Sequence, residues 1–116
     1  MFHATRTFVP LLLVVTATAQ LPSKPVLDLA AARQIAAAAH AAADARRATV
    51  VIAVVDDGGH LLLLERRDGT QVASPPVAEA KARTAAIFRR PTREFEEQIG
   101  NGRLATLVLP GCAPLQ

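Results

Sequence analysis

The chain has 116 residues, which is enough for one domain with one hydrophobic core. Hydrophobic residues make up 51% and charged residues 20% of the sequence, a globular composition that excludes a disordered chain. The formal net charge of +3 and the pI near 10.0 would suit a nucleic-acid-binding protein. Acidic residues are interleaved with the basic ones, however, and only 3% of residues are aromatic, so we predict no nucleic-acid partner.

The first nineteen residues have the pattern of a signal peptide. Arg6 gives a positively charged start, residues 8–15 form an apolar segment, and Ala17-Thr18-Ala19 fits the small-x-small cleavage pattern. The apolar segment is shorter than the ~20 residues that a membrane-spanning helix needs. We therefore predict that residues 1–19 are removed, and that a periplasmic or secreted protein remains without membrane attachment.

Residues 20–26 carry two prolines and are predicted to be an exposed linker before a domain that spans residues 27–116. Asp28 is placed to cap a helix that extends to about Arg47, because its carboxylate can accept hydrogen bonds from the first free amides. The body of this helix is rich in alanine, which has the highest helix propensity. Apolar residues recur on one side at helical spacing, so this face is expected to pack closely on a sheet.

Residues 50–66 hold the predicted centre of the fold. Two short apolar runs, residues 50–55 and 61–64, flank the quartet Asp56-Asp57-Gly58-Gly59, which is typical of two strands joined by a hairpin turn. We predict a two-residue type I′ turn at Asp57-Gly58, because glycine readily adopts the positive φ that this turn needs. Neither run alternates polar with apolar residues, so both faces of the hairpin should be covered by helices.

The chain after the hairpin predicts two more helices and a third strand. Ser74, as N-cap, and the two prolines after it form a strong helix start, and this helix should end before Pro91. A short helix is expected from Thr92, as N-cap, to Ile99, stopped by the glycine that follows. Residues 104–109 are predicted as a strand. The whole predicts an α/β fold, a sandwich in which helices flank an antiparallel sheet.

Lys81 lies within an apolar stripe of the second long helix, at helical spacing from Thr84 and Phe88. Two placements of its ammonium group remain open at this point. It either enters a cleft beside the sheet or extends along the domain edge to water. Arg83, by contrast, is expected to pair with Glu79 on the outer face of the helix.

Thr92 places a hydroxyl at the start of the short helix, with Arg89, Arg90 and Arg93 close by in the sequence. Capping the helix is a sufficient role for this hydroxyl. The functional alternative is an anion site at the helix start that suits carboxylates or propionates. His40 flanks the apolar face of the first helix, where it is either structural or a metal or haem ligand.

No catalytic or metal-binding motif is evident in the chain. No two histidines share the spacing of metal ligands, and Cys112 has no obvious His or Asp partner. As the single cysteine, it also excludes a disulfide within the chain. We therefore predict no resident metal ion and no enzymatic activity.

The ordered set of segments resembles the GlcG/HbpS family of haem-binding proteins, whose domain also forms the C-terminal part of PduO-type proteins. The resemblance rests on V-V-I-A-V-V-D-D-G-G-H-L-L, the R-R-D-G turn, K-A-R-T-A-A followed by R-P-T, and L-P-G-C-A-P-L-Q. It implies an α/β/α sandwich around an antiparallel sheet, a homo-oligomer, and haem as the cofactor. Family members normally continue with two more strands and a helix, so a truncated domain is expected, with an exposed strand edge at residues 104–109.

The resemblance also implies which residues contact haem. A threonine near the P-T element is the proposed iron contact, which maps to Thr92, with Thr84 as the fallback. Another branch of the family uses a histidine of the first helix, and His40 is the matching residue. Lys81 and Arg90 complete the cofactor-binding residues that we predict.

The predicted function is therefore that of a periplasmic or secreted haem-binding protein in haem sensing, storage or oxidative-stress response. One alternative is an enzyme-accessory or small organic-acid-binding domain, as used in glycolate or cobalamin-linked metabolism. The other is a purely structural assembly module.

Overall fold

The structure is a computed structural model that describes Met1 and residues 19–113. Its elements are α1 (Leu29–Ala45), β1 (Val51–Val55), β2 (Leu61–Arg66), α2 (Ser74–Phe88), α3 (Thr92–Gly100) and the 3₁₀ helix η1 (Leu104–Val108). The signal-peptide pattern lies almost entirely outside the described residues, so its cleavage stays a prediction. No helix in the described part of the chain has the length and apolar character to cross a membrane.

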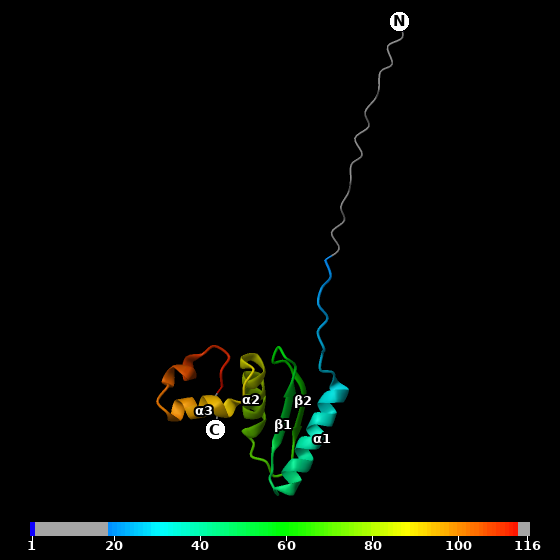
Figure 1. The fold of residues 1–116 in the computed structure, drawn as a ribbon. Helices are drawn as coiled ribbons and strands as arrows, with labels where there is room; N and C mark the ends of the chain where they lie inside the picture. The colour runs from blue at the N-terminus through cyan, green and yellow to red at the C-terminus, as the bar shows by residue number, and fades with distance from the viewer. Residues whose placement is uncertain (2–18, 114–116) are drawn as a thin grey trace.

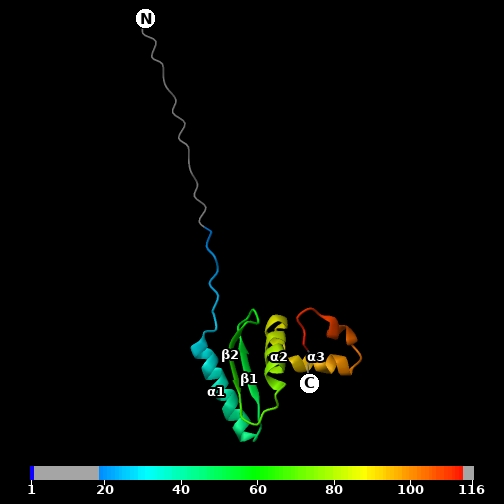
Figure 2. The same ribbon diagram turned by 180° about the vertical axis from the view of Figure 1, so that it is seen from behind.

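The β1–β2 hairpin is the middle layer of a sandwich, with α1 on one face and α2 on the other (Figures 1 and 2). Its strands pair antiparallel, with Val51 opposite Arg66 and Val54 opposite Leu63. Successive side chains of a strand point to opposite faces, and both faces here are apolar. This arrangement confirms the predicted helix–sheet–helix sandwich.

The first helix forms where the sequence predicts it. Asp28 is the N-cap of α1, and its carboxylate accepts a hydrogen bond of 2.8 Å from the amide of Ala31. The buried residues of the helix are all alanines. Their small side chains let the α1 backbone lie close to the hairpin.

The hairpin turn differs from the predicted type I′ turn. The left-handed residue is Gly59, at φ 81°, and neither Asp57 nor Gly58 has a positive φ. The Gly59 amide donates to the Asp56 carbonyl at 3.0 Å, the geometry of a three-residue loop that ends in a glycine bulge. The Asp56 carboxylate selects this loop, because it accepts hydrogen bonds of 2.9 Å from the amides of Gly58 and His60. The His60 amide, and then that of Gly58, hold the pKa of the Asp56 carboxyl below its ordinary value.

Two predicted helix caps are wrong, and so is one helix stop. Ser74 and Thr92 are the first helical residues of α2 and α3, and neither helix start has a side-chain cap hydrogen bond. Pro91 is the N-cap of α3, at φ −59° and ψ 139°. The proline ring fixes the backbone φ angle just before the helix, so the helix starts here without a side-chain cap. At the other end of α3, Gly100 is still helical, and the left-handed residue is Gly102, at φ 85°.

The predicted strand at residues 104–109 is wrong. Its first five residues form η1, and the sheet of the described residues has two strands, so no strand edge exists there. This segment turns back to lie against α3 (Figure 1). A strand needs a partner strand, and this position offers none. Thr106 alone is buried in η1, while Leu104 is 62% and Val108 80% exposed.

An aromatic contact joins α3 to α2. Phe95 is 1% exposed and is the buried residue of α3. The Phe95 ring meets that of Phe88 edge-on, with the ring centroids 5.3 Å apart and an interplanar angle of 70°. The Arg90 guanidinium carbon lies 5.0 Å from the centroid of the Phe95 ring. This contact sets the position of α3, and with it the position of Thr92.

Candidate functional site

An open groove of about 630 Å³ is bounded by β1, α2 and the start of α3. The alternation along β1 builds its floor, since Val51 and Ala53 line the groove, whereas Ile52 between them lines only a cavity beside the alanines of α1. A mostly apolar cleft of this volume with a few polar groups is typical of small-molecule sites. The apolar lining residues are Val51, Ala53, Val77, Ala78, Ala82 and Ala85.

Lys81 extends from α2 into the lining of this groove. Its Nζ donates a hydrogen bond of 2.6 Å to Oε1 of Glu96 on α3. The two side chains are 32% and 20% exposed, so the pair is partly shielded from water. Of the two placements that the sequence left open, the structure shows the cleft, with a carboxylate beside the ammonium group.

Thr92 lines the same groove from the start of α3. Because the helix begins at this residue, its hydroxyl caps no amide, which corrects the capping prediction. Within residues 19–113 the Thr92 hydroxyl makes no hydrogen bond. The structure therefore brings two of the predicted site residues, Lys81 and Thr92, to one cleft, with a hydroxyl available to a ligand.

Thr84 does not line the groove. It is fully buried, and its hydroxyl donates to the Ala80 carbonyl and accepts from the Ala113 amide, both at 2.8 Å. These bonds fasten the segment after η1 to α2. The role that the structure shows for Thr84 is therefore structural.

His40 lies on the opposite face of the hairpin from the groove, because α1 and α2 cover different faces (Figure 1). Its Nε2 is 2.6 Å from Oε2 of Glu65 on β2, and the two side chains are 28% and 42% exposed. With the hairpin layer between them, His40 and Thr92 do not share a site.

The three arginines near the start of α3 do not line the groove. Arg90 lies over the Phe95 ring, and Arg93 pairs along α3 with Glu97, with 3.5 Å between Nε and Oε1. Arg89 ends α2 in the left-handed conformation, at φ 53°. The expected arginine site for propionates is therefore not assembled around the groove.

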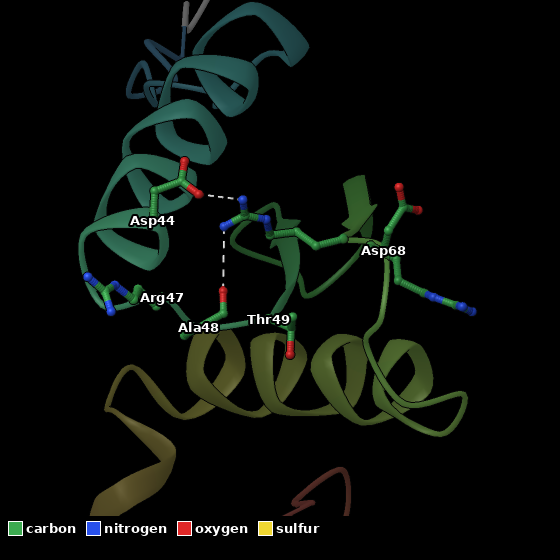
Figure 3. Close-up of a pocket in the computed structure, with 7 residues that line it drawn as sticks. Asp44, Arg47, Ala48, Thr49 and Asp68 are labelled. Carbon is green, nitrogen blue, oxygen red and sulfur yellow. Dashed lines mark hydrogen bonds and ion pairs between the residues drawn. The ribbon is translucent and has the colours of Figure 1, made fainter.

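A second, more polar pocket of about 520 Å³ lies where the end of α1 meets the end of β2 (Figure 3). The Arg67 guanidinium pairs with the Asp44 carboxylate and donates to the Ala48 carbonyl at 3.5 Å. Arg47 and Arg66 also line the pocket. Sequence reasoning missed this pocket, because its residues come from two segments that meet only in the fold. The only sign of this pocket in the sequence is the two pairs of adjacent arginines, at positions 46–47 and 66–67.

Neither a metal cluster nor an activated thiol is found in residues 19–113. No three of the His, Cys, Asp and Glu side chains described there could hold a metal ion. Burial raises the pKa of the Cys112 thiol, and the nearby Arg90 charge opposes this shift. A thiol with a raised pKa is mostly protonated near neutral pH, and the thiolate is the nucleophilic form.

Comparison with known proteins relates the chain to haem proteins. Residues 27–116 match the family described as "Haem degrading protein HbpS-like". The crystal structure of HbpS has 33% sequence identity and a TM-score of 0.71, over 88% of this chain and 72% of HbpS. A double mutant of Streptomyces reticuli HbpS has 33% identity and a TM-score of 0.70, over 91% and 73% of the two chains. The Klebsiella pneumoniae protein ORFY has 29% identity and a TM-score of 0.69, over 83% and 68%. No significant match was found among curated proteins.

Proposed function

Because the chain belongs to the HbpS-like family of haem degrading proteins, we propose that it binds haem in the groove between β1, α2 and α3. The observation that carries this proposal is the convergence of Lys81 and Thr92 on one apolar cleft. Haem sensing, storage or a role in oxidative stress are the physiological uses that we propose for such binding.

The residues of the groove fit a haem group. Small apolar side chains of β1 and α2 offer a surface on which a porphyrin face can lie. The Thr92 hydroxyl is an oxygen ligand without a hydrogen-bond partner in the described residues, so it is our candidate contact for the iron. Lys81 is the cation of the lining. Bound haem would supply an iron centre that can change redox state, and these residues would bind and orient it.

A haemin titration tests the proposal. Saturable binding should produce a shifted Soret band. The absorbance of the haem complex also tests our prediction that the chain is not an enzyme. Loss of the Soret band after addition of a reductant and oxygen, in excess of a protein-free control, would show haem degradation instead. A titration without saturation would refute haem binding.

We predict that Thr92→Ala weakens haemin binding by about tenfold, the equivalent of one lost polar contact. Its effect on the free energy of unfolding should be small, because the hydroxyl caps no amide. Arg83→Ala is the control. Arg83 is exposed on α2 outside the groove, and the described residues include no ion pair between it and Glu79. Unchanged haemin affinity in a folded Thr92→Ala protein would remove Thr92 from the site and favour His40.

Binding of a small organic acid is our second candidate function. The polar pocket of Figure 3 favours it, because Arg47 and Arg66 line that pocket beside the Arg67–Asp44 pair and guanidinium groups bind carboxylates. Calorimetry with glycolate as the probe separates the two functions. Glycolate binding without haemin binding would replace the first candidate with the second.

We also propose that the protein is exported and that its mature N-terminus is Gln20. In support, residues 20–26 are exposed and belong to no helix or strand, with Leu21 88% exposed. A signal peptidase could therefore reach the bond after Ala19 even in the folded chain. Mass spectrometry of protein recovered from the periplasm or medium should show the loss of nineteen residues. An intact Met1 in a cytoplasmic fraction would contradict export.

A homo-oligomer is the assembly that we propose. Apolar side chains exposed on η1 support it, since Leu104, Leu107 and Val108 are 62%, 52% and 80% exposed. Light scattering coupled to size-exclusion chromatography measures the assembly directly.

A further inference from the structure

We propose that Glu96 sets the charge selectivity of the groove, because it competes with ligand carboxylates for Lys81. This inference rests on the proposed function, in which the groove holds haem. It adds a specificity-determining residue that does not itself line the groove.

The geometry of α3 places Glu96 for this role. Glu96 follows Thr92 by four residues, so the two side chains lie on the same face of the helix. Thr92 lines the groove, while Glu96 reaches across to Lys81 on the α2 wall. The docking of α3 on α2 through Phe95 therefore positions the hydroxyl and the carboxylate together.

The partial burial of the Lys81–Glu96 pair strengthens the competition between Glu96 and a ligand carboxylate. Glu96 is 20% and Lys81 32% exposed, whereas the Arg93–Glu97 pair of the same helix is 80% and 64% exposed. Water and salt screen a shielded pair less than an exposed one. A ligand carboxylate that approaches Lys81 meets the Glu96 carboxylate at 2.6 Å from the same nitrogen atom. It must displace Glu96 or tolerate its charge, so the groove disfavours anionic ligands relative to neutral ligands of the same shape.

The test compares haemin with its dimethyl ester, in which both propionates are neutral. Glu96→Gln should tighten haemin binding about three- to tenfold, the effect of one partly shielded like charge. The variant should change the affinity for the dimethyl ester by less than about twofold. Glutamine can still accept a hydrogen bond from Lys81, so α3 should stay docked. Glu97→Gln is the matched control, because it removes the same charge one residue away on an exposed side chain, and it should change neither affinity.

A double variant assigns the effect to the right pair. In a Lys81→Met background there is no ammonium group to compete for, so Glu96→Gln can relieve only direct repulsion between Glu96 and the propionates. The same change in haemin affinity in both backgrounds would show direct repulsion rather than competition for Lys81. Equal tightening of haemin and its ester, no tightening, or weaker haemin binding in Glu96→Gln would each overturn the role of Glu96 while haem binding itself stands. If the wild-type chain binds neither haemin nor the ester, the proposed function is wrong and this inference is refuted with it.

Discussion

Replacing Phe95 with alanine is expected to lower the free energy of unfolding by about 3–5 kcal/mol. Phe95 is 1% exposed and is one of the two largest fully buried side chains of the described residues. Its removal takes away buried apolar area, the edge contact with Phe88 and the aromatic face under Arg90. Natural domains are stable by only about 5–15 kcal/mol, so this loss is a large share of the total.

The same variant should abolish haemin binding if the groove is the haem site. The start of α3 is a wall of the groove, and Phe95 is the buried residue that holds this helix on α2. Urea denaturation followed by circular dichroism measures the loss of stability, and a haemin titration in native buffer measures the loss of binding. Phe95→Leu is the comparison variant, because it also loses the ring contacts but leaves a smaller cavity, so it should cost less than Phe95→Ala. A Phe95→Ala protein as stable as the wild type would show that α3 is not docked through this ring.

The parts of the fold that the sequence predicted correctly are those that local chemistry determines. The Asp28 carboxylate lies within three residues of the amide that it caps, and the alanine-rich segment after it has one strong preference. The two β-strand segments are close in sequence and pair with each other, so the hairpin needs no distant partner. Local patterns decide such elements before the chain packs.

The errors concern features that a non-local partner or a one-residue shift determines. The apolar segment at residues 104–109 has the composition of a strand but meets no second strand, so it coils against α3. Ser74 and Thr92 have capping side chains, yet each helix starts at that residue and leaves its hydroxyl inside the first turn. Composition alone does not distinguish these positions, because the cap and the first helical residue are neighbours.

The candidate site was predictable only in part. The sequence predicts Lys81 and Thr92 as site residues, and the structure brings both to one groove. Glu96 was missed, since its pairing with Lys81 depends on how α3 crosses α2, which the Phe95 contact sets. The one available signal was its position four residues after Thr92.

Gly59→Ala is expected to cost about 2–4 kcal/mol, the second largest effect that we predict. Gly59 is buried and has a φ of 81°, a conformation that costs an L-residue with a side chain about 1–2 kcal/mol. An added Cβ would lie 2.8 Å from Cγ of Arg83 and 3.2 Å from Cγ2 of Ile87. Both neighbours belong to α2, so the methyl group would push the hairpin turn away from the helix that covers it.

The glycine beside it provides the matched control. Gly58 has no positive φ, and the nearest atoms to an added Cβ are side-chain atoms of His60 and Asp56 at 3.1 and 3.3 Å. Gly58→Ala should therefore cost less than about 1 kcal/mol, because the exposed imidazole of His60 can move aside. Urea unfolding of the two variants compares the same added methyl group one residue apart. Equal losses would show that the turn does not pack on α2 through Gly59. A larger loss in Gly58→Ala would favour the type I′ turn over the glycine bulge.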